Sequence, residues 1–183
     1  MAIKTFTTGE VLTAADTNTY LANSGLVYIK QQTVGAGVAS VSVTSAFSSE
    51  YEHYRIIYMG GTGSGASSLG LALTGSTTGY YAAVTGANYA GGTGSINDSN
   101  NSSWTFTGIV TTNFCSLDVV LYQPFASART GMQINGRVDM RTDGASFIGG
   151  GWHNVAASYT GFTLSSGQNM SGGIIYVYGF RKA

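Results

Sequence analysis

Residues 172–181 read Gly-Gly-Ile-Ile-Tyr-Val-Tyr-Gly-Phe-Arg, the last strand-like stretch of the chain. Its β-branched and aromatic residues fall on both faces of an alternating pattern, with Ile174, Tyr176 and Tyr178 on one face and Ile175, Val177 and Gly179 on the other. A strand that is apolar on both faces lies inside a sheet covered on two sides, or against a sister subunit. We therefore predict that this strand is central and that the upstream segments supply the other strands of the same β-structure.

The composition favours a neutral β-rich domain. The chain has 183 residues, of which 43% are hydrophobic, so it is long enough to bury a substantial core. Charged residues make up only 9%, against roughly 25% in ordinary soluble proteins, and the net charge is zero. Without a basic stripe, duplex nucleic acid is not an expected partner. A neutral surface favours self-association, which burial between copies in an oligomer would resolve.

Alternation with a period of two begins at Leu26, is interrupted over the irregular residues 77–103 and returns at Trp104. Residues 34–37 are expected to join the first two strands as a hairpin. Residues 77–103 are expected to form mostly long loops, with room for a short helix or strand near residues 80–84. No segment is long enough for a helical crossover, so we predict an all-β, antiparallel β-sandwich of the jelly-roll type. The expected strands are residues 26–33, 38–44, 54–59, 68–74, 104–111, 115–122, 132–141, 146–154, 159–165 and 172–181. Alternation places Leu69, Leu71 and Leu73 on one face of their strand. In residues 132–141 it directs Ile134, Gly136, Val138 and Met140 inward and Asn135, Arg137, Asp139 and Arg141 outward.

The first 25 residues differ from the remainder. Thr13 is suited to cap a short helix, with Asp16 at the capping-box position, and the helix would run to Asn23 with Gly25 as its stop. A helix of about two turns is not stable alone, so it must pack on its own domain, a sister chain or a larger assembly. We accordingly divide the chain into residues 1–25, an N-terminal segment with a short helix, and residues 26–183, the β-domain.

Motifs that carry chemistry are absent from the sequence. His53 and His153 do not form a metal-binding spacing, and Cys115 alternates with apolar residues as a buried side chain would. No Gly-x-Ser-x-Gly motif or phosphate-binding loop occurs. No stretch approaches the roughly 20 apolar residues of a membrane span. We expect no enzymatic activity, no cofactor, no metal and no membrane insertion.

Five aromatic residues lie in or near segments rich in Gly, Asn and Ser: Tyr80, Tyr81, Tyr89, Trp104 and Trp152. Flat rings stack on sugar faces while neighbouring amides bond hydroxyl groups, so this combination suits glycan binding. The same residues serve equally well as packing anchors under long loops or as contacts between subunits. They are therefore candidate ligand-binding residues, with packing as the competing interpretation.

Two stretches resemble bacteriophage virion proteins. Residues 6–18, Phe-Thr-Thr-Gly-Glu-Val-Leu-Thr-Ala-Ala-Asp-Thr-Asn, are similar to an opening common in phage tail-fibre and minor structural proteins, where it is associated with attachment to the particle. Residues 51–57 and 171–179 are similar to the early and final strands of jelly-roll domains in phage fibre and decoration proteins. The resemblance assigns anchoring to Phe6, Gly9, Glu10, Val11, Leu12, Asp16 and Asn18.

This resemblance implies a homotrimer located in the virion, anchored to other virion proteins by its N-terminus. Tyr176, Tyr178 and Phe180 would pack between subunits near the threefold axis. No repeat supplies a shaft, so we expect a short tail fibre or tip that binds a host-surface glycan. The alternative is a capsid decoration or cement protein, and a third possibility is a soluble carbohydrate-binding module or glycan-degrading enzyme.

Overall fold

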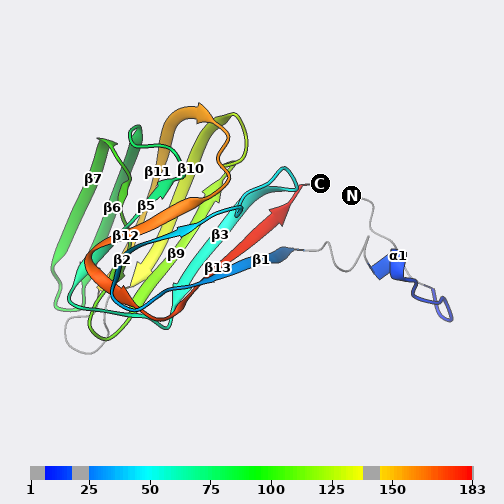
Figure 1. Ribbon diagram of the computed structural model, residues 1–183, viewed down its shortest axis with the longest axis horizontal. Coiled ribbons are helices and arrows are strands. Elements are labelled where there is room, and N and C mark those ends of the chain that lie inside the picture. Colours follow the sequence, from blue (N-terminus) through cyan, green and yellow to red (C-terminus); the bar gives the residue numbers. More distant parts are fainter. Residues whose placement is uncertain (1–6, 18–24, 138–144, 183) are drawn as a thin grey trace.

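A computed structural model describes residues 7–17, 25–137 and 145–182. These residues form an all-β structure in which every strand pairing is antiparallel, with one three-residue helix, α1 (Ala14–Asp16) (Figure 1). The strands are β1 (Leu26–Thr33), β2 (Val38–Val43), β3 (Tyr51–Met59), β4 (Thr62–Gly63), β5 (Ser67–Leu73), β6 (Tyr80–Asn88), β7 (Thr93–Asn101), β8 (Trp104–Val110), β9 (Cys115–Tyr122), β10 (Ala128–Arg137), β11 (Ala145–Ala157), β12 (Phe162–Ser171) and β13 (Ile174–Arg181).

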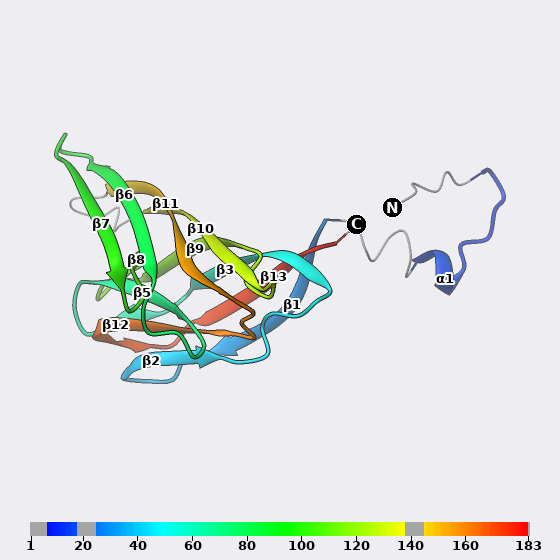
Figure 2. The ribbon, with the colours of Figure 1, turned by 90° about the horizontal axis from the view of Figure 1, so that it is seen from above.

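The strands form one continuous hydrogen-bonded network. Its main path runs β2-β12-β5-β8-β9-β10-β11-β6-β7, while β3 joins β9 to β13 and β13 joins β1. Strand β9 is the branch point, because β8 pairs with its first residues and β10 with its last, while β3 pairs along its other edge. The network curls, so that β12 and β2 run across β9 and β13 in Figure 1, and Figure 2 shows the same curl from above.

The core lies on the concave side of this curl. Phe47, in the connection after β2, stacks on Phe162 of β12 with ring centroids 5.8 Å apart. The same ring packs on Tyr54 of β3 at 4.7 Å. Phe47 therefore links two strands from distant parts of the network. The predicted alternations in β5 and β9 are confirmed, because their inward residues are buried: Leu69, Leu71, Leu73, Cys115, Leu117, Val119 and Leu121.

The central position predicted for the last strand is confirmed. Strand β13 lies between β1 and β3, and Tyr178 faces Tyr28 on one side and Arg55 on the other. Ile175 and Val177 point into the core and have no exposed surface. The opposite face of the strand carries its three aromatic side chains, which remain partly exposed in the single chain. One face of this strand thus belongs to the core, and the other is open.

The hairpin expected at residues 34–37 is wrong, although both flanking strands form. Strand β1 pairs with β13 and β2 pairs with β12, so the two are not hydrogen-bonded to each other. The connection instead lies beside the turn between β12 and β13: the Val34 amide donates to the Gly173 carbonyl (3.1 Å), and the Gly172 amide donates to the Gly35 carbonyl (3.2 Å). The chain crosses here from one part of the network to another.

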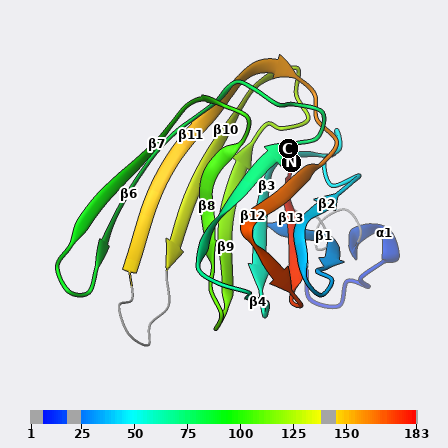
Figure 3. The same ribbon diagram turned by 60° about the vertical axis from the view of Figure 1, so that its left-hand side comes forward.

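Residues 77–103, expected as long loops, form mainly the β6–β7 pair, which Figure 3 shows at one end of the network. Strand β7 is rich in Gly, Ser and Asn, which are poor strand formers. Its return into β8 is held by Asp98, whose carboxylate accepts from the Thr105 amide (2.8 Å) and hydroxyl (2.6 Å) and from the Asn101 side chain (2.7 Å). Hydrogen bonding to β6 and the contacts of the buried Asp98 carboxylate therefore stabilise β7, although its own residues do not favour a strand.

The strand expected at residues 132–141 is described as far as Arg137. Met132 and Ile134 are buried and Asn135 is exposed, as predicted from the alternation. The expected inward Val138 and Met140 lie outside the described residues, and so do the outward Asp139 and Arg141.

The predicted capping box is confirmed in the N-terminal segment. The Thr13 hydroxyl accepts from the Asp16 amide (3.1 Å), and the Asp16 carboxylate accepts from the Thr13 amide (3.2 Å). The helix is minimal within the described residues, and its expected continuation to Asn23 falls outside them. Val11 is 79% exposed and Leu12 is also exposed, so neither side chain is buried by its own β-domain.

The packing of Phe162 on Phe47 predicts a large loss of stability on truncation. Phe162→Ala removes a fully buried ring and should lower the free energy of unfolding by about 3–5 kcal/mol. Urea unfolding followed by fluorescence measures the loss. Ile148→Ala, at an exposed position, is the matched control and should change stability by less than about 0.5 kcal/mol. Equal effects of the two substitutions would contradict the assignment of the core.

Candidate functional site

Side chains that alternate with the core residues form one surface, which we call the outer face. It extends over β1, β13, β3, β9, β10, β11 and β6. The strand registers place these side chains in rows that cross the sheet. It carries an unusual number of large apolar and aromatic groups that remain wholly or partly exposed: Leu26, Tyr28, Ile57, Tyr81, Val120, Tyr122, Ile148, Trp152, Tyr176, Tyr178 and Phe180.

The β1–β13–β3 part of the outer face gathers the predicted subunit-contact residues. The ring of Tyr178 meets Tyr28 edge-on at 5.9 Å and stacks near Tyr176 at 6.4 Å. Tyr28 is 52% exposed and Phe180 is 37% exposed. The structure therefore brings Tyr176, Tyr178 and Phe180 onto one open surface of the single chain.

An ion pair lies between this part and the remainder of the outer face. The guanidinium of Arg55 donates to both carboxylate oxygens of Asp118, at 2.8 and 2.6 Å. The hydrogen bonds that Arg55 donates to Asp118 raise the pKa of Arg55 above its ordinary value. Both side chains are more than a third exposed, so the pair contributes little to stability, about 1 kcal/mol or less. Its main effect is to leave the middle of the outer face without net charge.

The other part of the outer face carries two of the predicted ligand-binding residues. Trp152 of β11 and Tyr81 of β6 are cross-strand partners, and their rings stack at 5.6 Å with an angle of 14° between planes. The same row continues through Gly131 of β10 to Tyr122 of β9. His53 then meets Tyr122 edge-on at 5.2 Å.

The expectation that Tyr80 and Trp104 bind a ligand is corrected, because both rings are fully buried. Trp104 donates its indole N–H to the Tyr81 carbonyl (3.2 Å), and the Tyr80 hydroxyl accepts from the Leu73 amide (2.7 Å). Both are packing anchors. Tyr89 is 67% exposed after the end of β6, eight residues and about 26 Å of extended strand from Tyr81. Tyr89 therefore does not lie beside Trp152 and Tyr81.

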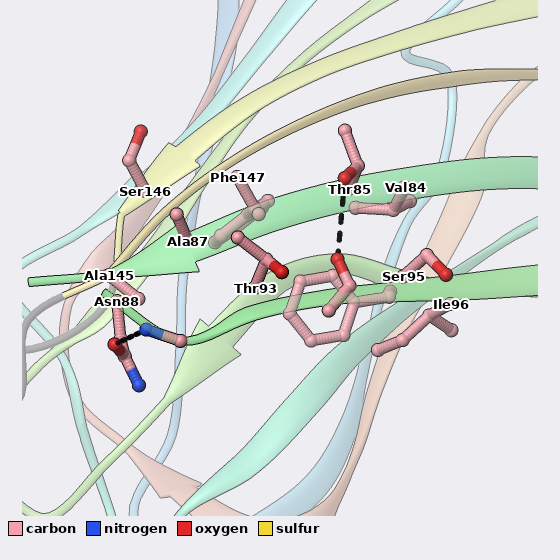
Figure 4. A pocket seen from close by; sticks show the side chains of 14 residues that line it. Val84, Thr85, Ala87, Asn88, Thr93, Ser95, Ile96, Ala145, Ser146 and Phe147 are labelled. Atoms are coloured by element: carbon pink, nitrogen blue, oxygen red, sulfur yellow. Dashed lines mark hydrogen bonds between the residues drawn. The ribbon is translucent and has the colours of Figure 1, made fainter. Parts of the chain in front are cut away.

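A separate groove of about 370 Å³ lies on the inner side of the β6–β7 pair, next to β11 (Figure 4). Phe106 and Phe147 contribute a pair of edge-to-face rings (4.8 Å), and Val84 and Ile96 add aliphatic surface. Gly86 and Gly94 lie between them without side chains. None of the lining residues is titratable, so the groove offers apolar contact and the hydroxyl groups of Ser and Thr residues, but no acid or base among its lining residues to activate them.

A Ser–His contact in the core does not form a catalytic pair. The Ser76 hydroxyl lies 2.7 Å from Nε2 of His153, but the Thr78 carbonyl lies 2.9 Å from the same nitrogen. A carbonyl only accepts, so Nε2 carries the proton and cannot remove one from Ser76. Nδ1 is left to accept from Tyr159 (3.3 Å). His153 has no exposed surface, and burial lowers its pKa below the ordinary 6.5.

Other reactive groups in the described chain are similarly engaged. Cys115 is buried, and burial raises the pKa of its thiol. Asp98 is nearly buried and accepts three hydrogen bonds, so its carboxylate closes a turn rather than facing a ligand.

Across residues 7–17, 25–137 and 145–182, no cluster of three or more His, Cys, Asp or Glu could hold a metal ion. Within the same ranges, no helix has the length and apolar character needed to cross a bilayer.

The predicted anchoring residues are only partly described. Gly9, Glu10, Val11, Leu12 and Asp16 lie in the described N-terminal segment, where the Glu10 carboxylate accepts from the Thr7 amide (3.1 Å). Phe6 and Asn18 lie outside it.

Sequence reasoning missed Tyr28, Tyr122 and the Arg55–Asp118 pair. Tyr122 and Asp118 lie on the outward phase of the strand whose inward stripe from Cys115 to Leu121 was recognised, as the position of Asp118 between Leu117 and Val119 shows. The alternation could have placed each of them on the outer face. The pairing of strands far apart in sequence, which brings them together, has no local signal.

Comparison with known proteins identifies no relative. No protein-family model, curated protein or solved structure matches this chain.

Burial of His153 in its neutral form predicts an acid-dependent loss of stability. The unfolded chain binds a proton at this residue below about pH 6.5, whereas the folded chain resists protonation until lower pH. The free energy of unfolding should consequently fall as the pH drops below 6.5, and His153→Gln should flatten this dependence. Urea titrations between pH 5 and 8 measure both. An NMR titration that shows His153 protonating at or above pH 6.5 in the folded protein would contradict the prediction.

Proposed function

We propose that this chain is a non-enzymatic structural protein of a phage virion, a short tail fibre or tip. Residues 1–25 attach it to the particle and residues 26–183 form the outward β-domain. The observation that carries the proposal is the exposure of Val11 and Leu12 within the phage-like motif, next to a capped turn. Apolar side chains exposed together on an ordered turn are typical of a surface that a partner buries.

We infer that the β-domain is a jelly-roll sandwich. The strand order supports this, since β1-β13-β3-β9 and β2-β12-β5-β8 are each sets of four neighbouring strands that meet at the β8–β9 pairing. The two sets interleave along the chain, as strands of a jelly roll do. The β6–β7 and β10–β11 pairs then extend the first set sideways.

We also propose that the chain assembles as a homotrimer through the β1–β13–β3 part of the outer face. Tyr28, Tyr176, Tyr178 and Phe180 form an exposed aromatic surface there, and the Arg55–Asp118 pair keeps it neutral. Aromatic side chains with little surrounding charge are typical of the buried centre of a subunit interface. Other virion proteins would bind the N-terminal segment, and the exposed loops and sheet face would meet a host-surface glycan.

A capsid decoration or cement protein is the alternative with the same architecture. It would use the same anchor and subunit contacts but bind nothing outside the particle. The number of copies per virion distinguishes the two: a few to a few dozen favour a fibre or tip, and hundreds favour decoration.

Attachment through the N-terminal segment predicts that residues 1–25 fused to a fluorescent reporter are recruited to particles during infection. Val11→Ser with Leu12→Ser should abolish recruitment, because the apolar contact is lost. Thr8→Ser is the matched control and should leave recruitment unchanged. Sedimentation of reporter fluorescence with purified particles measures the outcome. Absence of recruitment by the unaltered segment would sink the anchoring proposal.

Assembly through the β13 surface predicts a native mass about three times the 18.9 kDa of the chain. Tyr28→Ser with Tyr178→Ser should shift the protein to monomers, because both rings would leave the interface. Ile148→Ser, on the outer face but distant from β13, should not. Analytical ultracentrifugation reports the mass. A monomeric unaltered protein, or a variant that keeps its mass, would refute the interface.

A further inference from the structure

Strand β7 ends the main path of paired strands, and one of its edges has no strand partner among the described residues (Figures 1 and 3). It pairs with β6 alone. A free edge presents backbone N–H and C=O groups that can pair with a further strand, and proteins commonly protect it with a charged side chain, a proline or a β-bulge. The presence or absence of such protection decides whether the edge can accept a partner.

Residues 93–98 of β7 lack this protection. They contain no Lys, Arg or Pro, and their pairing with β6 is regular, because the bulge in this pair lies beyond Asp98. Asp98 is turned inward, where its carboxylate accepts from the amide and hydroxyl of Thr105 in β8. Strands β1 and β2 also have one strand partner each, but the bulge in β1 adjoins Lys30, whose amino group donates to the Thr44 carbonyl just after β2 (2.6 Å). A cation therefore lies beside those two strands, whereas the edge of β7 is uncharged.

The groove of about 370 Å³ borders the same stretch on its inner side (Figure 4). The contacts of Asp98 identify the inner face of β7, and alternation places Gly94 and Ile96 on that face. A side-chain carbon added at Gly94 would meet no described atom within 4 Å, so the space over this residue is open. Ile96 is 45% exposed, and Phe106 and Phe147 line the groove. An apolar side chain that arrives from the free edge thus finds both room and apolar contact.

The edge and the groove together identify the kind of partner. Pairing with the backbone of residues 93–98 requires an extended peptide, because a strand presents N–H and C=O groups at the matching spacing. Directly opposite side chains in such a pair lie about 4.5–5.5 Å apart, so the residue opposite Gly94 would lean over the open space. Since none of the lining residues is titratable, the side chain that suits the groove is large and apolar.

A further strand would also supply what β7 lacks. Its Gly, Ser and Asn residues do not favour a strand, and only β6 pairs with it in the single chain. Backbone pairing along the second edge would stabilise it, and the partner would cover the exposed Ile96.

We propose that the free edge of β7 is a strand-addition site. An extended segment of another protein pairs with residues 93–98 and inserts a large apolar side chain over Gly94. This site is distinct from the β13 surface and from the N-terminal segment, and it does not depend on the virion assignment.

A fluorescein-labelled peptide, Lys-Thr-Val-Thr-Phe-Thr-Val-Thr-Lys, tests the site on the full chain. Its apolar residues alternate with Thr, so that the Phe ring can lie over Gly94 while the backbone pairs with β7. Fluorescence anisotropy should show saturable binding, and hydrogen exchange followed by NMR should slow at residues 93–98. Replacement of the peptide's Phe by Gly should weaken binding about tenfold or more, because the apolar anchor is lost. Methylation of the peptide's backbone nitrogens should abolish binding.

Variants of the protein separate the site from non-specific peptide binding. Gly94→Val occupies the open space and should weaken the Phe peptide about tenfold or more. Ile96→Lys places a charge beside the edge and should weaken it likewise. Ile148→Ala removes an exposed apolar side chain from the outer face and should leave binding unchanged. Thermal unfolding verifies that each variant is folded, and Gly94→Ala replaces Gly94→Val if the larger side chain destabilises the protein.

Four results would overturn the proposal. They are absence of binding by the Phe peptide, equal binding of the Phe and Gly peptides, full affinity in the folded Gly94 variant, and slowed exchange at β1 or β2 instead of β7.

Discussion

The antiparallel pairing of β13 with both β1 and β3 is the interaction on which the rest of the structure depends. Among the described strands β1 pairs only with β13, so the backbone ladder of the first strand depends on the last. Ile175 and Val177 place this pairing at the centre of the core. Because the paired segments are separated by almost the whole domain, the loop-closure entropy is high and we expect slow, late completion of the fold.

The same strand explains why one face of the sheet remains apolar. Inward residues of β13 complete the core, and its outward tyrosines continue into a face that carries few charges and one neutralised ion pair. A surface of this composition favours contact with a further partner over exposure to water. The proposed assembly gives the aromatic cluster around Tyr178 to sister chains.

Alternation made much of the fold predictable where one face is buried. Leu69, Leu71 and Leu73, and the stripe from Cys115 to Leu121, were placed correctly because inward and outward residues differ in polarity. Strand β7 was missed because its Gly, Ser, Asn and Asp residues form a strand only through pairing with β6 and through Asp98. The hairpin at residues 34–37 was wrong for a related reason: local turn residues fit both a hairpin and a crossing between distant strands. Of the candidate site, Trp152 and Tyr81 were identified by composition, whereas Trp104 in a similar setting is a core residue. Composition alone does not distinguish the exposed Trp152 from the buried Trp104. The two differ in whether the residue lies on the outward or the inward face of its strand.

The most direct test of the virion assignment is electron microscopy of purified particles from the source lysate, labelled with gold-conjugated antibody against residues 26–183. The account predicts gold at the tail or at discrete spikes, because the β-domain would project outward from an N-terminal anchor. Label spread evenly over the head would favour the decoration protein. Absence of gold from every particle, with the protein present free in the lysate, would contradict the account.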